Sequence, residues 1–162
     1  MKRNVLYLLL GVSMLAIAGC SYKAVDITGY KMAQSFEQSI YNELSQETAQ
    51  YLSGDLYVRE SLSTEEPVIV ISAEVIFPRA IPLVASEICD ITANLLENDE
   101  YFSSYDISVL YMESNDGVAD KDSIVQWHTT GGGEGMFLDY KNDIMGQYTI
   151  EELYVYFVDF WE

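Results

Sequence analysis

The chain has 162 residues, of which 26 are acidic, 8 are lysine or arginine and one is histidine, so its formal net charge is −18 at neutral pH. This balance excludes binding to nucleic acid through the phosphates, which requires clustered lysine and arginine side chains. Aromatic residues make up 13% of the chain. A disordered acidic tail would contain few of them, so the composition predicts a folded domain.

The N-terminal segment combines the features of an export signal. Lys2 and Arg3 precede an uncharged apolar run over residues 5–18. This run is shorter than the roughly 20 apolar residues that a membrane-spanning helix needs, and the charge asymmetry is typical of a signal peptide. A pair of small residues, Ala-Gly, comes directly before Cys20 and suits cleavage by a signal peptidase.

A cysteine placed directly after such a pair resembles the lipobox of bacterial membrane lipoproteins. The resemblance implies that the thiol of Cys20 receives a diacylglyceryl group and that residues 1–19 are removed. Acyl chains such as palmitate would then hold the protein at the extracytoplasmic side of the cell membrane, because two chains anchor a soluble domain stably where one does not. A plain secretory signal and an uncleaved N-terminal anchor are the alternatives.

Cleavage before Cys20 would leave 143 residues, enough for one domain with its own core. The removed segment carries Lys2 and Arg3 but no acid, so the net charge would become −20. Such a charge favours a soluble monomer and is compatible with a basic partner, a cationic peptide or a divalent cation. The other cysteine, Cys89, cannot pair with a lipidated Cys20. We therefore expect no intrachain disulfide. The place of Cys89 in a helical pattern predicts a small buried core residue.

The first half of the domain shows one helical and two strand patterns. Apolar side chains recur at multiples of four over residues 30–53 and predict a helix that Gly54 ends. Alternating patterns predict strands over residues 56–63 and 68–77, which would form a hairpin.

The middle of the chain continues with a second helix and two more strands. Pro82 suits the first turn of that helix, whose apolar spacing continues to about Asn98. Residues 105–111 alternate between apolar and polar side chains and predict a third strand. A polar turn over residues 115–122 separates it from a fourth strand over residues 123–130.

The C-terminal part contains a glycine loop and an ambiguous last element. Residues 131–135 read Gly-Gly-Gly-Glu-Gly and predict a hairpin loop, because glycine adopts positive φ at little cost. A fifth strand over residues 136–140 and a loop over residues 141–148 follow. Thr149 and Glu152 have the spacing of a capping box, which favours a final helix. The Tyr-Val-Tyr-Phe-Val run that follows favours a strand, which stays the alternative.

The expected order of elements is α-β-β-α-β-β-β-α. Each helix carries one apolar stripe, which suits packing on one face of a sheet. The sequence therefore predicts an α+β fold with a mainly antiparallel sheet of about five strands and helices on one face. The expected segments are a signal peptide over residues 1–19, a lipidated tether over residues 20–29 and a single acidic domain over residues 30–162.

Three residues near the glycine loop are candidates for a surface binding site. Trp127 and His128 lie on the fourth predicted strand, and Glu134 lies in the loop. A single histidine cannot build a multi-histidine metal site. Pairing His128 with Cys89 as a nucleophile is disfavoured, because activated cysteines lie at helix starts or near positive charge. We assign no catalytic residue, cofactor or metal ligand from the sequence.

Two loops permit a second interpretation. The triple glycine suggests a phosphate cradle, but such a loop leads from a strand into a helix and carries lysine with serine or threonine. Oxygen ligands in the polar turn would suit calcium, although their spacing does not fit an EF-hand loop and an acidic surface turn is the alternative. The candidate ligands in that turn are Asn115, Asp116, Asp120 and Asp122.

The sequence favours a lipid-anchored, non-catalytic binding or interaction module of the bacterial cell envelope, with a protein or peptide partner. One alternative is a small envelope hydrolase that uses carboxylates, for which the chain offers 26 candidates. The other is a calcium-dependent binding domain. A deep pocket with two convergent acids would support the hydrolase, whereas a flat or shallow surface would support the binding module.

Overall fold

The computed structural model describes residues 28–61, 66–115 and 118–161. The expected signal peptide and Cys20 lie outside these residues, so lipidation stays a prediction. The first helix begins at Thr28 and includes the last two residues of the expected tether. Within the described part of the chain, no helix has both the length and the apolar character needed to cross a membrane.

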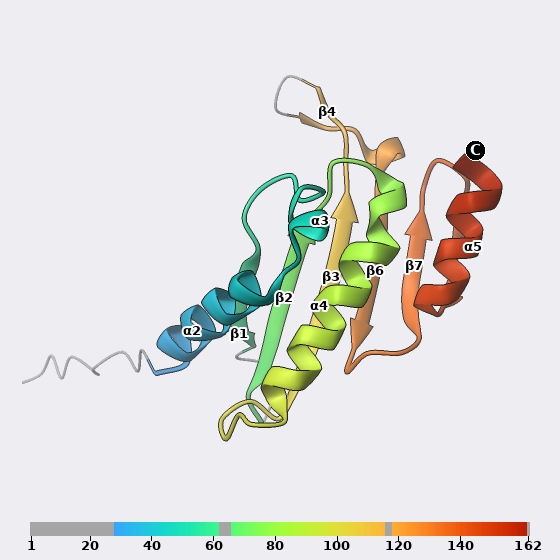
Figure 1. Ribbon diagram of the computed structural model, residues 1–162. Coiled ribbons are helices and arrows are strands. Elements are labelled where there is room, and N and C mark those ends of the chain that lie inside the picture. The colour runs from blue at the N-terminus through green and yellow to red at the C-terminus, as the bar shows by residue number, and fades with distance from the viewer. Residues whose placement is uncertain (1–27, 62–65, 116–117, 162) are drawn as a thin grey trace, which may run out of the picture.

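A mixed sheet of six strands forms the centre of the domain. The strands are β1 (Tyr57–Ser61), β2 (Val68–Glu74), β3 (Ser104–Tyr111), β6 (Val125–Thr130), β7 (Gly135–Asp139) and β8 (Ile144–Tyr148). They lie in the order β1-β2-β3-β6-β7-β8 (Figure 1). β2 and β3 are parallel, and the other neighbouring pairs are antiparallel. A helix joins the parallel pair, because parallel strands need a crossover connection.

Helices cover one face of this sheet (Figure 1). The three longer ones are α2 (Thr28–Glu43), α4 (Ile81–Leu96) and α5 (Ile150–Trp161). The shorter elements are α3 (Gln46–Ala49), the 3₁₀ turns η1 (Pro78–Ala80) and η2 (Lys121–Ser123), and a hairpin of β4 (Ser114–Asn115) and β5 (Val118–Ala119). The expected α+β class, mainly antiparallel sheet and single helical layer are confirmed.

The core lies between the helices and the covered face of the sheet. Alternate residues of β2 and β3, including Ile71 and Ile107, are fully buried there. Trp127 and Phe137 are the largest fully buried side chains and are paired across β6 and β7. Along these strands the buried residues alternate with more exposed ones, as expected for a sheet with one covered face.

The prediction of one helix over residues 30–53 is wrong beyond Glu43. Ser45 interrupts it, because its hydroxyl accepts a hydrogen bond of 3.1 Å from the amide of Thr48 and caps α3. The carboxylate of Glu87, on α4, accepts hydrogen bonds from the amide and hydroxyl of Ser45 at 2.5 and 2.9 Å. The break between α2 and α3 is therefore stabilised both by the local Ser45 cap and by the contact of Ser45 with Glu87.

The prediction of a loop over residues 141–148 is also wrong, because this segment contains β8. Its sequence, Ile-Met-Gly-Gln-Tyr, lacks the clear alternation that marks a strand. Asp143 takes a positive φ of 55° at the preceding turn, and the strand then pairs along β7. Hydrogen bonding to β7 therefore makes this segment a strand although its own sequence pattern does not predict one. The sheet has six strands rather than the expected five or so.

The C-terminal helix prediction is confirmed. The amide of Thr149 donates a hydrogen bond of 2.7 Å to Glu152, and the amide of Glu152 donates one of 3.2 Å to the Thr149 hydroxyl. This reciprocal cap begins α5 directly after β8. Leu153 and Phe157 then bury the apolar face of the helix, so packing favours the helix over the alternative strand.

Candidate functional site

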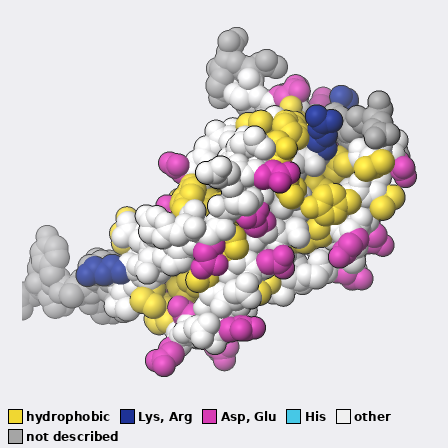
Figure 2. All heavy atoms as spheres, in the orientation of Figure 1, with side chains coloured by type: hydrophobic (Ala, Val, Ile, Leu, Met, Phe, Trp, Pro, Cys, Tyr) yellow, Lys and Arg dark blue, Asp and Glu magenta, His cyan; other side chains and the backbone are white. Residues whose placement is uncertain are grey.

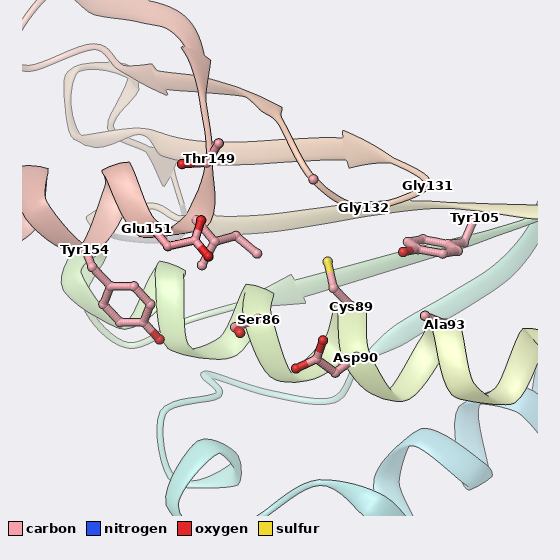
Figure 3. A pocket seen from close by; sticks show the side chains of 12 residues that line it. Ser86, Cys89, Asp90, Ala93, Tyr105, Gly131, Gly132, Thr149, Glu151 and Tyr154 are labelled. Carbon is pink, nitrogen blue, oxygen red and sulfur yellow. The ribbon is translucent and has the colours of Figure 1, made fainter.

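A pocket of about 400 Å³ lies between α4, α5 and the loop that joins β6 to β7 (Figure 3). We call it the α4–α5 pocket. The polar side chains and the thiol that define its chemistry come from α4, β3 and α5: Ser86, Cys89, Asp90, Tyr105, Glu151 and Tyr154. It opens on the helix-covered side of the molecule, where acidic side chains are spread over the surface (Figure 2). Its volume is within the range of small-molecule sites.

The glycine loop closes one side of this pocket. Gly131, Gly132 and Gly133 have φ values of 74°, 79° and 87°, a conformation that other residues adopt only with strain. A Cβ at Gly132 would lie 2.6 Å from the hydroxyl oxygen of Tyr105. The loop connects two antiparallel strands, which confirms the hairpin prediction and excludes the strand-to-helix geometry of a phosphate cradle.

Tyr105 is the most buried of the hydroxyl-bearing residues that line the pocket. It lies on β3 and is only 7% exposed, and its ring points under the glycine loop toward Cys89 (Figure 3). Among the described residues the hydroxyl has no hydrogen-bond partner, although the backbone carbonyl of Tyr105 accepts a bond from Gly131. Burial, followed by the charges of Cys89 and Asp90, raises the pKa of Tyr105. The group is therefore a neutral phenol that is free to bond with a guest molecule.

Cys89 has the properties of a core thiol and not of a nucleophile. It is 7% exposed, which confirms the prediction of a buried residue. Burial, with a smaller contribution from Asp90, raises its pKa to about 12. His128 lies on the opposite, uncovered face of the sheet, since its neighbour Trp127 faces the helices. A thiol–imidazole pair is therefore excluded.

Two carboxylates and one aromatic ring lie at the rim of the pocket. Asp90 extends from α4 and Glu151 from α5, and both are exposed. Tyr154 is 41% exposed, and burial followed by the charge of Glu151 raises its pKa. Lysine, arginine and histidine do not occur among the described residues that line the pocket. The charged groups at this site are thus all negative.

The three surface candidates from the sequence do not form one site. The prediction that Trp127 belongs to a surface site is wrong. Its side chain is fully buried, and its indole donates a hydrogen bond of 3.5 Å to the carbonyl of Tyr148. Strand alternation turns Trp127 into the core and His128 outward. His128 lies in a hollow of about 170 Å³ on the uncovered face, beside Met136 and Met145.

The other predicted loop residues also lie apart from the α4–α5 pocket. Glu134 is exposed, and its backbone carbonyl accepts a hydrogen bond of 3.1 Å from Thr129 within the hairpin. In the polar turn, the Asp120 side chain caps η2 by accepting a bond of 3.0 Å from the amide of Asp122. No group of three or more metal-ligating side chains occurs in the described ranges, and Asp116 lies outside them.

The residues of the α4–α5 pocket were not selected from the sequence as a site. Asp90, Tyr105 and Glu151 belong to three elements that are far apart in the chain, and no motif links them. The alternation along its strand predicts that Tyr105 points inward. The sequence does not show that its hydroxyl lacks a hydrogen-bond partner, because this depends on tertiary packing. Comparisons of the chain with models of protein families, with curated proteins and with solved structures gave no match.

Proposed function

We propose that this chain is a lipid-anchored binding protein of the bacterial cell envelope that holds a ligand in the α4–α5 pocket. The observation that carries the proposal is the hydroxyl of Tyr105, which has no partner among the described residues and belongs to a side chain only 7% exposed in a pocket of ligand size. A bound molecule can form a hydrogen bond with this hydroxyl without displacing a protein partner.

The location rests on the N-terminal sequence. Cys20 follows a lipobox-like segment, and the first described helix begins at Thr28. The residues between them, 20–27, span at most about 28 Å when extended, so acyl chains on Cys20 would keep the pocket close to the bilayer. The net charge of −20 expected after cleavage leaves no basic patch as a second attachment.

Binding without chemistry is favoured over hydrolysis by the surroundings of the acidic groups. A general acid must keep its proton near neutral pH, which requires burial or a close anion. Asp90 and Glu151 are exposed instead, and the thiol of Cys89 has a pKa of about 12. Hydrolysis by a carboxylate pair is the second candidate, because two acids do line this pocket.

A ligand screen with matched variants tests the binding function. The full-length lipidated protein in zwitterionic lipid nanodiscs is heated with each member of a small-molecule library. A true ligand raises the Tm of wild type and of the control variant Tyr111→Phe. Tyr111 lies on β3, as Tyr105 does, but its hydroxyl is bonded to Glu113 and does not line the pocket. The same ligand does not raise the Tm of Tyr105→Phe. Equal responses of both variants would contradict the proposal, and recovery of a cleaved ligand would identify a hydrolase.

A labelling experiment tests the anchor separately. Cells that express wild type or Cys20→Ser are grown with a fatty-acid probe and then fractionated. We expect label and membrane association for wild type only, because the variant lacks the thiol that would be acylated. Equal labelling of both proteins, or an unlabelled wild type, would refute the lipoprotein interpretation.

A further inference from the structure

We infer that the α4–α5 pocket recognises an alkylammonium group, carried either by a free amine or by a lysine side chain. This inference rests on the proposed binding function and names its ligand class. Three features of the pocket carry it: the sign of its charges, the hydroxyl inside it and the apolar surface between them.

The charges around the pocket favour cations over anions. Asp90 and Glu151 approach the rim from two different helices, and the described lining residues include no positive side chain to offset them. The chain as a whole adds to this field, with a net charge of −18. Because both carboxylates are exposed, salt screens their attraction, and each contributes modestly to binding.

The hydroxyl of Tyr105 is an observation independent of the charges. An ammonium group has three donors and no acceptor, whereas a phenol oxygen has lone pairs that accept hydrogen bonds. This oxygen belongs to a side chain that is only 7% exposed, has no partner among the described residues and lies close to Gly132. An ammonium group that enters the pocket would therefore find a neutral acceptor inside and two anions at the rim.

The remaining lining suits an alkyl chain. Ala93 and Ile150 contribute apolar surface from α4 and α5, and the ring of Tyr154 lies at the rim. Apolar stems of cationic groups pack on such surfaces while the charge reaches polar groups, and tyrosine rings attract cations through their faces. The pKa values of Cys89, Tyr105 and Tyr154 are raised first by burial, so these groups stay neutral and the negative charge of the pocket comes from the rim carboxylates.

Direct binding of simple probes tests this ligand class. The full-length lipidated protein in zwitterionic nanodiscs is titrated with butylammonium and with a blocked Gly-Lys-Gly peptide, and saturation-transfer NMR measures Kd. Butanol and the acetyl-lysine peptide are the uncharged counterparts, and empty nanodiscs are the blank. We expect both ammonium probes to bind about tenfold more tightly than their counterparts. Tighter binding of the peptide would indicate a lysine of a protein partner, and tighter binding of butylammonium a free amine.

Charge-matched variants then locate the binding. The double variant Asp90→Asn/Glu151→Gln should weaken ammonium binding about tenfold, and Tyr105→Phe by a similar factor. The control Glu97→Gln/Asp159→Asn removes the same charge at two exposed positions, one directly after α4 and one on α5, that do not line the pocket. It should change Kd less than about twofold. Equal losses in both double variants would overturn the inference, because they would assign binding to the general acidic field.

The two proposals fail in different ways. If the library screen finds a neutral or anionic ligand that depends on Tyr105 while the ammonium probes do not bind, the binding function stands and the ligand class is wrong. If neither the library nor the ammonium probes show binding that depends on Tyr105, both proposals are refuted.

Discussion

The hydroxyl of Tyr156 on α5 donates a hydrogen bond of 2.6 Å to Oδ2 of Asp139 on β7, and both side chains are buried. Asn142 completes the arrangement, because its side chain donates to the same oxygen at 2.7 Å and its amide to Oδ1 at 3.1 Å. Three donors therefore satisfy a buried carboxylate that would otherwise be costly. The contact holds α5, one wall of the α4–α5 pocket, against the sheet.

Replacing Tyr156 by phenylalanine tests the strength of this contact. We expect Tyr156→Phe to lower the free energy of unfolding by about 2 kcal/mol, because a buried carboxylate loses a donor. Urea denaturation followed by circular dichroism measures the change. The control Tyr154→Phe removes a half-exposed hydroxyl from the same helix and should change the value by less than about 0.5 kcal/mol. Equal losses would show that the bond to Asp139 is not what stabilises α5.

The same contact predicts a loss of stability at alkaline pH. Burial, followed by the hydrogen bond and charge of Asp139, raises the pKa of Tyr156 above its ordinary value of 10. The folded protein thus keeps a proton that the unfolded chain releases, so the free energy of unfolding is unaffected below about pH 10 and falls above it. Urea titrations from neutral pH to pH 11 should show a shallower fall for Tyr156→Phe than for wild type. Parallel curves would contradict this.

The break between α2 and α3 predicts the opposite dependence on pH. Burial alone would raise the pKa of Glu87, but hydrogen bonds from the α3 turn, including those of Ser45, lower it overall. Stability from this group is complete above its ordinary pKa of 4.5 and is lost as the pH falls. Glu87→Gln should therefore cost about 1 kcal/mol at neutral pH and less at pH 3. Glu97→Gln, at the end of the same helix, is the control, and an unchanged cost at pH 3 would contradict the assignment.

A double-mutant cycle tests the closeness of the glycine loop to Tyr105. Gly132→Ala places a Cβ at 2.6 Å from the Tyr105 hydroxyl oxygen, whereas Gly133→Ala meets open space at a similar positive φ. We expect both to cost about 1–2 kcal/mol of backbone strain, and Gly132→Ala to cost more. Tyr105→Phe should remove that excess, giving a coupling free energy of about 0.5–1 kcal/mol in urea denaturation. Additive losses would show that the loop and the ring do not touch.

Much of the fold was predictable because local periodicity reports which side chains are buried. The alternation over residues 105–111 and the capping box at Thr149 each gave the correct element. Cys89 was placed correctly in the core for the same reason. The error at Ser45 arose where a contact distant in sequence, with Glu87, accompanies the local structure. The error over residues 141–148 arose where pairing with the preceding strand, β7, defines an element that its own pattern does not show.

Sequence alone determined the acidic character, the α+β class and the lipobox-like Cys20, since all three depend on composition or on neighbouring residues. The candidate site depended on tertiary structure. Trp127 and His128 are adjacent in the chain yet lie on opposite faces of the sheet, whereas Asp90, Tyr105 and Glu151 are distant in the chain and line one pocket. A pocket is made where elements pack, and which elements pack together follows from the crossover of α4 and the order of the strands.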